Sequence, residues 1–152
     1  MRLVESEWLA VGNGFSIKTK YRLIVLCCLL LASCSAEDRK LQQYFIHGQE
    51  LYLKHCSNCH QKNGKGLGLV YPPVDVSDFI DNRPEEVICL IEYGKQGELA
   101  VNGKSFNKAM PGVPTLTDLE IAEIVTYLYN NWGRKKGLTD VNHVTETLKR
   151  CQ

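Results

Sequence analysis

Residues 56–60 read Cys-Ser-Asn-Cys-His, and this motif constrains the chain more than any other feature. Residues three apart in a helical turn lie on one face, so Cys56 and Cys59 can each form a thioether bond at the same edge of a porphyrin. His60 then points at the metal as its proximal ligand. The spacing therefore predicts one covalent c-type haem, attached through Cys56 and Cys59 and ligated axially by His60.

Two other interpretations of the motif have weaker support. A zinc site needs a second pair of cysteine or histidine ligands, and the downstream cysteines, Cys89 and Cys151, stand alone. A thioredoxin-like dithiol is expected beside a βαβ pattern, whereas this motif ends an amphipathic segment. A redox pair or a chance match is the alternative to haem attachment.

The N-terminal region has the pattern of an export signal. Three basic residues between positions 18 and 22 precede a short apolar run at 23–31, as in a secretory signal peptide, and this run is too short to span a bilayer comfortably. The next residues, Leu-Ala-Ser-Cys at 31–34, resemble the bacterial lipoprotein cleavage box and predict lipidation of Cys34. The alternative is cleavage at small residues, with Cys34 incidental.

These signals predict four segments. We expect an N-terminal extension and lipoprotein signal peptide at 1–33, which is removed, and an anchor with a short tether at 34–43. The haem domain then covers 44–133, and 134–152 form a C-terminal tail with a possible short helix. No internal repeat interrupts this order.

The charge and the remaining cysteines say little about partners. Four of the 18 basic and two of the 17 acidic residues lie upstream of Cys34, so the mature chain has a net charge of about −1. This balance argues against a nucleic-acid partner, which favours a strongly basic face. Cys89 and Cys151 could pair in an oxidising compartment. Because Cys89 lies in an apolar helical pattern and Cys151 at a terminus, we expect two unpaired thiols.

Apolar periodicity predicts helices joined by irregular segments. The first runs from Tyr44 to Cys56 and delivers the haem motif. A second begins at Pro84 and stops at Gly94. The third follows a capping box formed by Thr117 and Glu120. Long loops are expected at 61–77 and 95–114, and a short final helix with little apolar surface at 139–149.

At this point the chain resembles a monohaem class I cytochrome c in its bacterial lipoprotein form. The resemblance runs from about Ile46 to Trp132. The segments that carry it are Gly48-Gln49-Glu50-Leu51-Tyr52, the haem motif, Tyr71-Pro72-Pro73 and Met110-Pro111-Gly112.

The resemblance implies an all-α, cytochrome c-like helical fold wrapped around the haem. The first and last helices of such a fold cross, with Gly48 meeting Tyr127 or its neighbours. The carbonyl group of Pro72 is expected to accept a hydrogen bond from His60, which fixes the orientation of the imidazole. The chain departs from the family at Val74-Asp75, where related sequences commonly have leucine or alanine.

Met110 is the predicted second axial ligand. The chain has two methionines, and Met1 lies upstream of the processed domain; the resemblance places Met110 over the haem. A thioether ligand favours the reduced state of the iron and raises its potential. The alternative is a methionine that fills a gap in the core. His47, His55 and His143 are rival ligands, but the first two share a helix with the thiols and the third lies in the tail.

With both axial positions filled, the iron has no open site, and outer-sphere electron transfer is the remaining chemistry. We therefore expect a periplasm-facing electron carrier, held on a bacterial membrane by its lipid, without substrate turnover of its own. It would exchange electrons with a donor and an acceptor redox protein. One alternative is the haem subunit of a larger dehydrogenase, oxidase or reductase complex. A haem peroxidase or gas sensor is another, if Met110 dissociates readily.

Overall fold

The structure is a computed structural model, which describes residues 21–22, 24–26 and 35–151. The chain divides into two units, residues 1–35 and 36–152, and the second holds the fold. Cys34 and most of the predicted signal peptide lie outside the described residues. Within the described ranges, no helix has the length and apolar character needed to cross a membrane.

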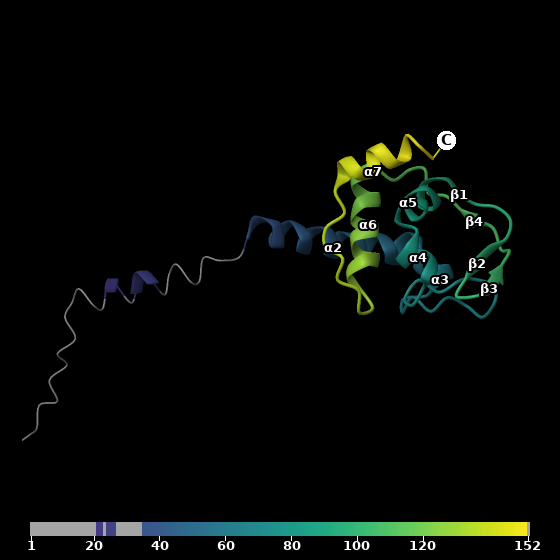
Figure 1. The fold of residues 1–152 in the computed structure, drawn as a ribbon, viewed down its shortest axis with the longest axis horizontal. Coiled ribbons are helices and arrows are strands. Elements are labelled where there is room, and N and C mark those ends of the chain that lie inside the picture. The colour runs from purple at the N-terminus through teal and green to yellow at the C-terminus, as the bar shows by residue number, and fades with distance from the viewer. Residues whose placement is uncertain (1–20, 23, 27–34, 152) are drawn as a thin grey trace, which may run out of the picture. The chain divides into compact units, whose positions relative to one another are not determined.

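Helices dominate residues 36–151, as Figure 1 shows, and the strands are short. The expectation of a small helical fold is confirmed. The elements in chain order are α2 (Ala36–His55), α3 (Ser57–His60), α4 (Asp78–Asn82), α5 (Pro84–Tyr93), β1 (Gly94–Lys95), β2 (Leu99–Val101), β3 (Lys104–Phe106), β4 (Met110–Pro111), α6 (Asp118–Asn130) and α7 (Val141–Leu148).

The crossing of α2 and α6 is the most extensive contact between elements. Gly48 makes it possible, because a Cβ atom at this position would lie 2.0 Å from the carbonyl oxygen of Glu123 and 2.9 Å from Cβ of Tyr127. The predicted meeting of Gly48 with Tyr127 is confirmed. Four aromatic rings close around the crossing, with centroid separations of 5.3 to 5.6 Å: Phe45, Tyr52, Tyr127 and Trp132.

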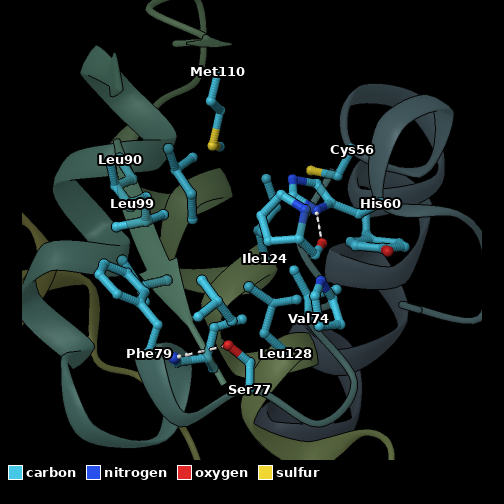
Figure 2. Close-up of a pocket in the computed structure, with 17 residues that line it drawn as sticks. Cys56, His60, Val74, Ser77, Phe79, Leu90, Leu99, Met110, Ile124 and Leu128 are labelled. Carbon is cyan, nitrogen blue, oxygen red and sulfur yellow. Dashed lines mark hydrogen bonds between the residues drawn. The ribbon is translucent and has the colours of Figure 1, made fainter. Parts of the chain in front are cut away.

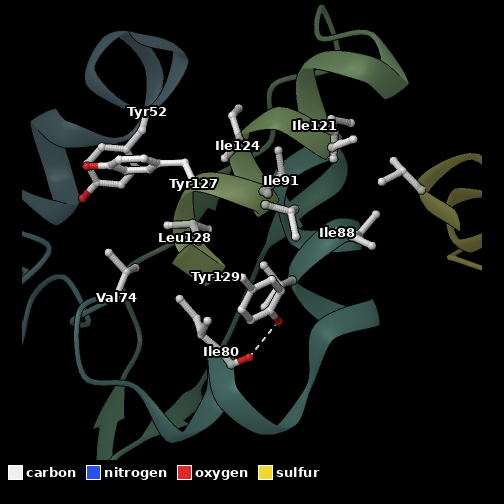
Figure 3. Close-up of a cluster of buried hydrophobic side chains, with 14 of the residues drawn as sticks. Tyr52, Val74, Ile80, Ile88, Ile91, Ile121, Ile124, Tyr127, Leu128 and Tyr129 are labelled. Carbon is white, nitrogen blue, oxygen red and sulfur yellow. Dashed lines mark hydrogen bonds between the residues drawn. The ribbon is translucent and has the colours of Figure 1, made fainter. Parts of the chain in front are cut away.

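Helix α6 forms the centre of the core (Figure 3). The predicted capping box is present: the Glu120 amide donates to the Thr117 hydroxyl at 3.3 Å, and the Thr117 amide donates to the Glu120 carboxylate at 2.8 Å. Near the other end, the Tyr129 hydroxyl donates to the Ile80 carbonyl oxygen at 2.8 Å. Helix α6 is buried along most of its length, because α2, α5 and α7 all pack against it.

The first helix begins earlier than the periodicity predicted. It starts at Ala36 rather than Tyr44, so most of the expected tether is helical. Glu37 and Asp38 lie in its first turn, where negative charge interacts favourably with the helix dipole. An ion pair of 3.8 Å joins Lys40 to Asp140, at the start of α7. This polar segment lacks an apolar stripe, and for that reason its helix was not predicted.

The segment 95–114 was predicted as loop, and this is wrong in part. Strands β2 and β3 pair antiparallel around Asn102-Gly103, and β1 pairs with β4. Asn102 has a φ of 52° and Gly103 a φ of 70°, values typical of a tight two-residue hairpin turn. The Asn-Gly pair is therefore the sequence signal that could have revealed this hairpin. The five-residue helix α4 was also missed.

The C-terminal region packs more firmly than expected. Helix α7 was predicted to have little apolar surface, yet Val144 is fully buried. The expectation of two unpaired thiols is wrong, because Cys89 and Cys151 form a disulfide with a Cα–Cα distance of 5.7 Å. The packing of α7 on α5 brings the two residues together, and Arg150 also forms an ion pair of 3.2 Å with Glu85.

Replacing Cys89 and Cys151 with serine should lower the free energy of unfolding by about 2–4 kcal/mol. The bridge joins residues 62 positions apart and so restricts the unfolded chain strongly. Guanidinium unfolding measures the effect, with the single variant Cys89→Ser as a control that should match the double variant. Alkylation of Cys89 or Cys151 in unfolded, unreduced protein would contradict the bridge.

Candidate functional site

The haem motif lies where α2 gives way to α3. The Cys56 amide donates to the Tyr52 carbonyl at 2.9 Å, and the Cys59 and His60 amides both donate to the Cys56 carbonyl, at 3.1 and 3.0 Å. The backbone thus continues as a tight turn that holds both cysteines and the histidine. Cys56 and Cys59 are free and half-buried, and burial raises the pKa of the Cys56 thiol to about 12. Both sulfur atoms are available for covalent attachment of a ligand.

A hydrogen bond to the backbone orients the imidazole of His60. Its Nδ1 lies 2.9 Å from the carbonyl oxygen of Pro72, so Nδ1 carries the proton and donates, since a carbonyl can only accept. Burial lowers the pKa of His60, and the Pro72 bond opposes this shift. The neutral ring consequently keeps a lone pair on Nε2, the atom that a metal would bind. The contact expected between His60 and Pro72 is present; the role of each residue toward a metal stays a prediction.

His60, Cys56 and Met110 face one cavity, whose walls come from α4, α5, α6 and β2 (Figure 2). The sulfur of Met110 points into this cavity from β4. The lining is almost wholly apolar. Its residues are Tyr52, Cys56, His60, Pro72, Pro73, Val74, Ser77, Phe79, Ile80, Val87, Leu90, Ile91, Leu99, Val101, Met110, Ile124 and Leu128.

A second, smaller hollow shares four of these residues, among them His60 and Met110, and adds Cys59 and Tyr71. The two cysteines, the histidine and the methionine therefore line two hollows that meet at shared residues. This arrangement fits a haem: its apolar ring needs an apolar slot, its covalent links need two thiols, and its iron accepts a nitrogen and a sulfur ligand. The residues present can hold that group.

The rival ligands do not reach this space. Among the described residues that line the two hollows, His60 is the only histidine and Met110 the only methionine. His47 instead lies 3.1 Å from the buried carboxylate of Glu123. The zinc alternative also lacks support, because the described part of the chain contains no group of three or more metal-ligating His, Cys, Asp or Glu side chains.

Sequence reasoning missed several residues of the site. Tyr52 is 1% exposed, and its hydroxyl donates to the Gln61 carbonyl at 2.6 Å; Gln61 itself has a φ of 63°. Burial raises the pKa of Tyr52 strongly, so its hydroxyl stays protonated and can donate. Leu99 and Val101 reach the cavity from the β2–β3 hairpin, and only the Asn-Gly turn signal pointed toward them.

Comparison with known proteins identifies several similar chains. Residues 45–128 match the family model described as cytochrome c oxidase, cbb3-type, subunit III. Cytochrome c-552 of Thermus thermophilus is 32% identical over 93 residues, which cover 59% of this chain and 70% of that protein. A second cytochrome c-552, from a named strain of the same species, also shows 32% identity, over 62% of its length.

A longer relative matches over part of its length. The cytochrome c subunit of alcohol dehydrogenase (quinone) from Gluconobacter oxydans is 32% identical over 89 residues. These residues cover 57% of this chain but 18% of that subunit. The region 45–128 includes the haem motif, Pro72 and Met110.

Tyr52→Phe should lower the free energy of unfolding by about 1 kcal/mol, because it leaves the partly buried Gln61 carbonyl without its donor. The matched control is Tyr93→Phe, at a ring that is 51% exposed, where we expect almost no change. Denaturant unfolding of both variants provides the measurement. Equal stabilities would show that the Tyr52 hydroxyl contributes nothing to holding the motif.

Proposed function

Because this chain belongs to the cytochrome c family, we propose that it is a periplasm-facing carrier of single electrons with one covalently attached haem c. The observation that carries this proposal is that two thiols, one imidazole and one thioether line two neighbouring, largely apolar hollows, which share His60 and Met110. It is a combination that suits a six-coordinate haem and few other groups.

Each residue contributes a separate property to the site. Cys56 and Cys59 would hold the ring by thioether bonds, and His60 would bind the iron through Nε2. Pro72 keeps the imidazole in the required tautomer through the 2.9 Å hydrogen bond. Met110 would supply the opposite ligand, whose sulfur favours the reduced state. When bound, the haem supplies one-electron redox chemistry.

The cavity walls favour electron transfer over substrate chemistry. If His60 and Met110 both bound the iron, no coordination position would remain for oxygen or peroxide. None of the described residues that line the larger hollow is an Asp, Glu, Lys or Arg, which a peroxidase could use for proton transfer. A haem held in this way would supply one-electron exchange that needs no new bond at the iron. A carrier of this kind would take its electron from one redox protein and pass it to another.

A second candidate is a haem subunit fixed in a larger complex. The family model is described as a subunit of an oxidase, and the Gluconobacter relative is named as a subunit of a dehydrogenase. The short distance between the predicted anchor at Cys34 and the start of α2 at Ala36 is compatible with a fixed position. Persistent co-elution with a dehydrogenase or oxidase in gel filtration of detergent extracts would favour the subunit over the free carrier.

We also propose that the chain is a bacterial lipoprotein of the monohaem class I type. The support is in the sequence: basic residues, an apolar run at 23–31, and the box that ends at Cys34. Ser35 follows the anchor in place of the aspartate that resembles an inner-membrane retention signal, and this favours the outer membrane. Residues 134–152, proposed as a tail, contain α7.

A redox titration followed by optical spectra tests the function. Protein made in a host with haem-attachment machinery should be red and low-spin, with a weak sulfur-to-iron band near the red end of the ferric spectrum. Met110→Ala should remove this band and lower the potential by about 0.1 V or more, within the roughly 0.8 V range over which axial ligands tune haem. His60→Ala should abolish stable haem binding.

Other results would overturn parts of this proposal. A high-spin ferric spectrum with rapid cyanide or carbon monoxide binding in the unmodified protein would indicate a peroxidase or gas sensor instead. An unchanged spectrum in Met110→Ala would show that another side chain is the ligand. Colourless protein with the mass of the bare polypeptide would exclude covalent haem altogether.

The lipid anchor has its own test. Cells fed labelled palmitate should incorporate the label into the unmodified protein, and Cys34→Ser should abolish incorporation and release the red protein from membranes. Cys28→Ser, upstream of the predicted cleavage site, is the matched control and should leave labelling unchanged. Labelling that persists in Cys34→Ser would disprove lipidation at this residue.

A further inference from the structure

We propose that Gly94 and Gly112 are positioning residues for the Met110 ligand. Their bare backbones let the strand that carries Met110 lie directly on the end of α5. This inference rests on the proposed ligation by Met110 and adds the device that sets the place of its sulfur atom. We call Gly94 and Gly112 the glycine pair.

Gly112 lies in direct contact with the backbone of the last turn of α5. A Cβ atom at this residue would lie 2.2 Å from the Glu92 carbonyl oxygen, 2.6 Å from the Tyr93 carbonyl carbon and 2.8 Å from the Gly94 amide nitrogen. All three neighbours are backbone atoms, which cannot rotate away as a flexible side chain could. Any side chain at position 112 must therefore displace one of the two backbones.

Gly94 makes the same contact from the opposite strand. Its φ is 76°, a conformation that glycine adopts readily. A Cβ atom here would lie 2.4 Å from the carbonyl oxygen of Met110 itself and 2.5 Å from the Gly112 amide nitrogen. The backbone of the proposed ligand thus rests on Gly94 without an intervening side chain.

Backbone pairing keeps the two segments in register. In the β1–β4 ladder Lys95 pairs with Met110 and Gly94 with Pro111, and the Val113 amide donates to the Ile91 carbonyl at 2.9 Å. Residues 110–113 are therefore joined to 91–95 at several points. Pro111 adds a fixed φ directly after the methionine.

The same helix that supports Met110 also forms a wall of the cavity. Val87, Leu90 and Ile91 of α5 line it together with Met110. The distance between the methionine and this wall is consequently set by backbone contact at the glycine pair, rather than by adjustable side-chain packing. A displacement of the strand by one added methyl group should move the sulfur relative to the slot.

Gly112→Ala is the first test, because its φ lies outside the left-handed region and the substitution adds steric contact alone. Measured on the haem-loaded protein, it should weaken the sulfur-to-iron band, lower the potential and accelerate carbon monoxide binding to the reduced form. Met110→Ala provides the limit for complete loss of the ligand. Haem content and far-UV circular dichroism should stay near those of the unmodified protein.

Gly94→Ala and Gly97→Ala form a matched pair. Both glycines have a φ of 76°, but a Cβ atom at Gly97 meets nothing within 4 Å. Gly97→Ala therefore controls for an alanine at positive φ, and only Gly94→Ala, at a residue whose ψ is −169°, adds the contact with the methionine strand. We expect the spectral and potential changes in Gly94→Ala and not in Gly97→Ala.

The outcomes separate this inference from the proposed ligation. If Met110→Ala leaves the spectrum unchanged, the ligand assignment itself is wrong. If Met110→Ala removes the band while both Gly112→Ala and Gly94→Ala keep it and the parent potential, the inference about the glycine pair fails alone. Loss of all red protein in both variants, with a normal yield of Gly97→Ala, would also overturn it, because the contact would then serve folding in general.

Discussion

The close approach of α2 to α6 at Gly48 is the contact on which the rest of the structure depends. With no side chain at this position, the backbone of α2 meets the backbone of α6 at Glu123. The rings of Tyr52 and Tyr127 then pack at 5.3 Å, and Cys56, directly after the end of α2, lines the cavity together with Ile124 and Leu128 of α6. The location of the thiols is thus a consequence of how two helices cross.

The two sides of the site are held in place by different interactions. The proximal half is local: His60 and Pro72 are 12 residues apart and joined by one hydrogen bond. The distal half brings Met110 from a remote segment through backbone pairing with the end of α5. An apolar cavity separates His60 from Met110. Burial in it keeps His60 neutral, and its lining favours a ligand with an apolar surface. A slot of this kind suits a group whose charge changes by one electron without rearrangement of its surroundings.

Much of the fold and the site could be predicted where the signals are local. The haem motif, the capping box at Thr117 and the stop at Gly94 each reside in a few adjacent residues, and the structure has all three elements. Polar residues at the start of α2 carry no periodicity, so its first two turns were missed. The disulfide was missed because its formation depends on the docking of α7 against α5, which no pattern around Cys89 or Cys151 encodes.

The sequence by itself determined the chemistry of this protein: which side chains can bind a porphyrin, and that they occur at the spacing that one helical turn requires. Only the tertiary structure brings these side chains together around the same space. Gly94 and Gly112 are 18 positions apart, and no local pattern indicates that their backbones meet and place Met110 beside the cavity. The physical reason is that the spacing of a few adjacent residues decides which side chains can attach to one ring. Close packing instead depends on distant segments that only the folded chain brings into contact.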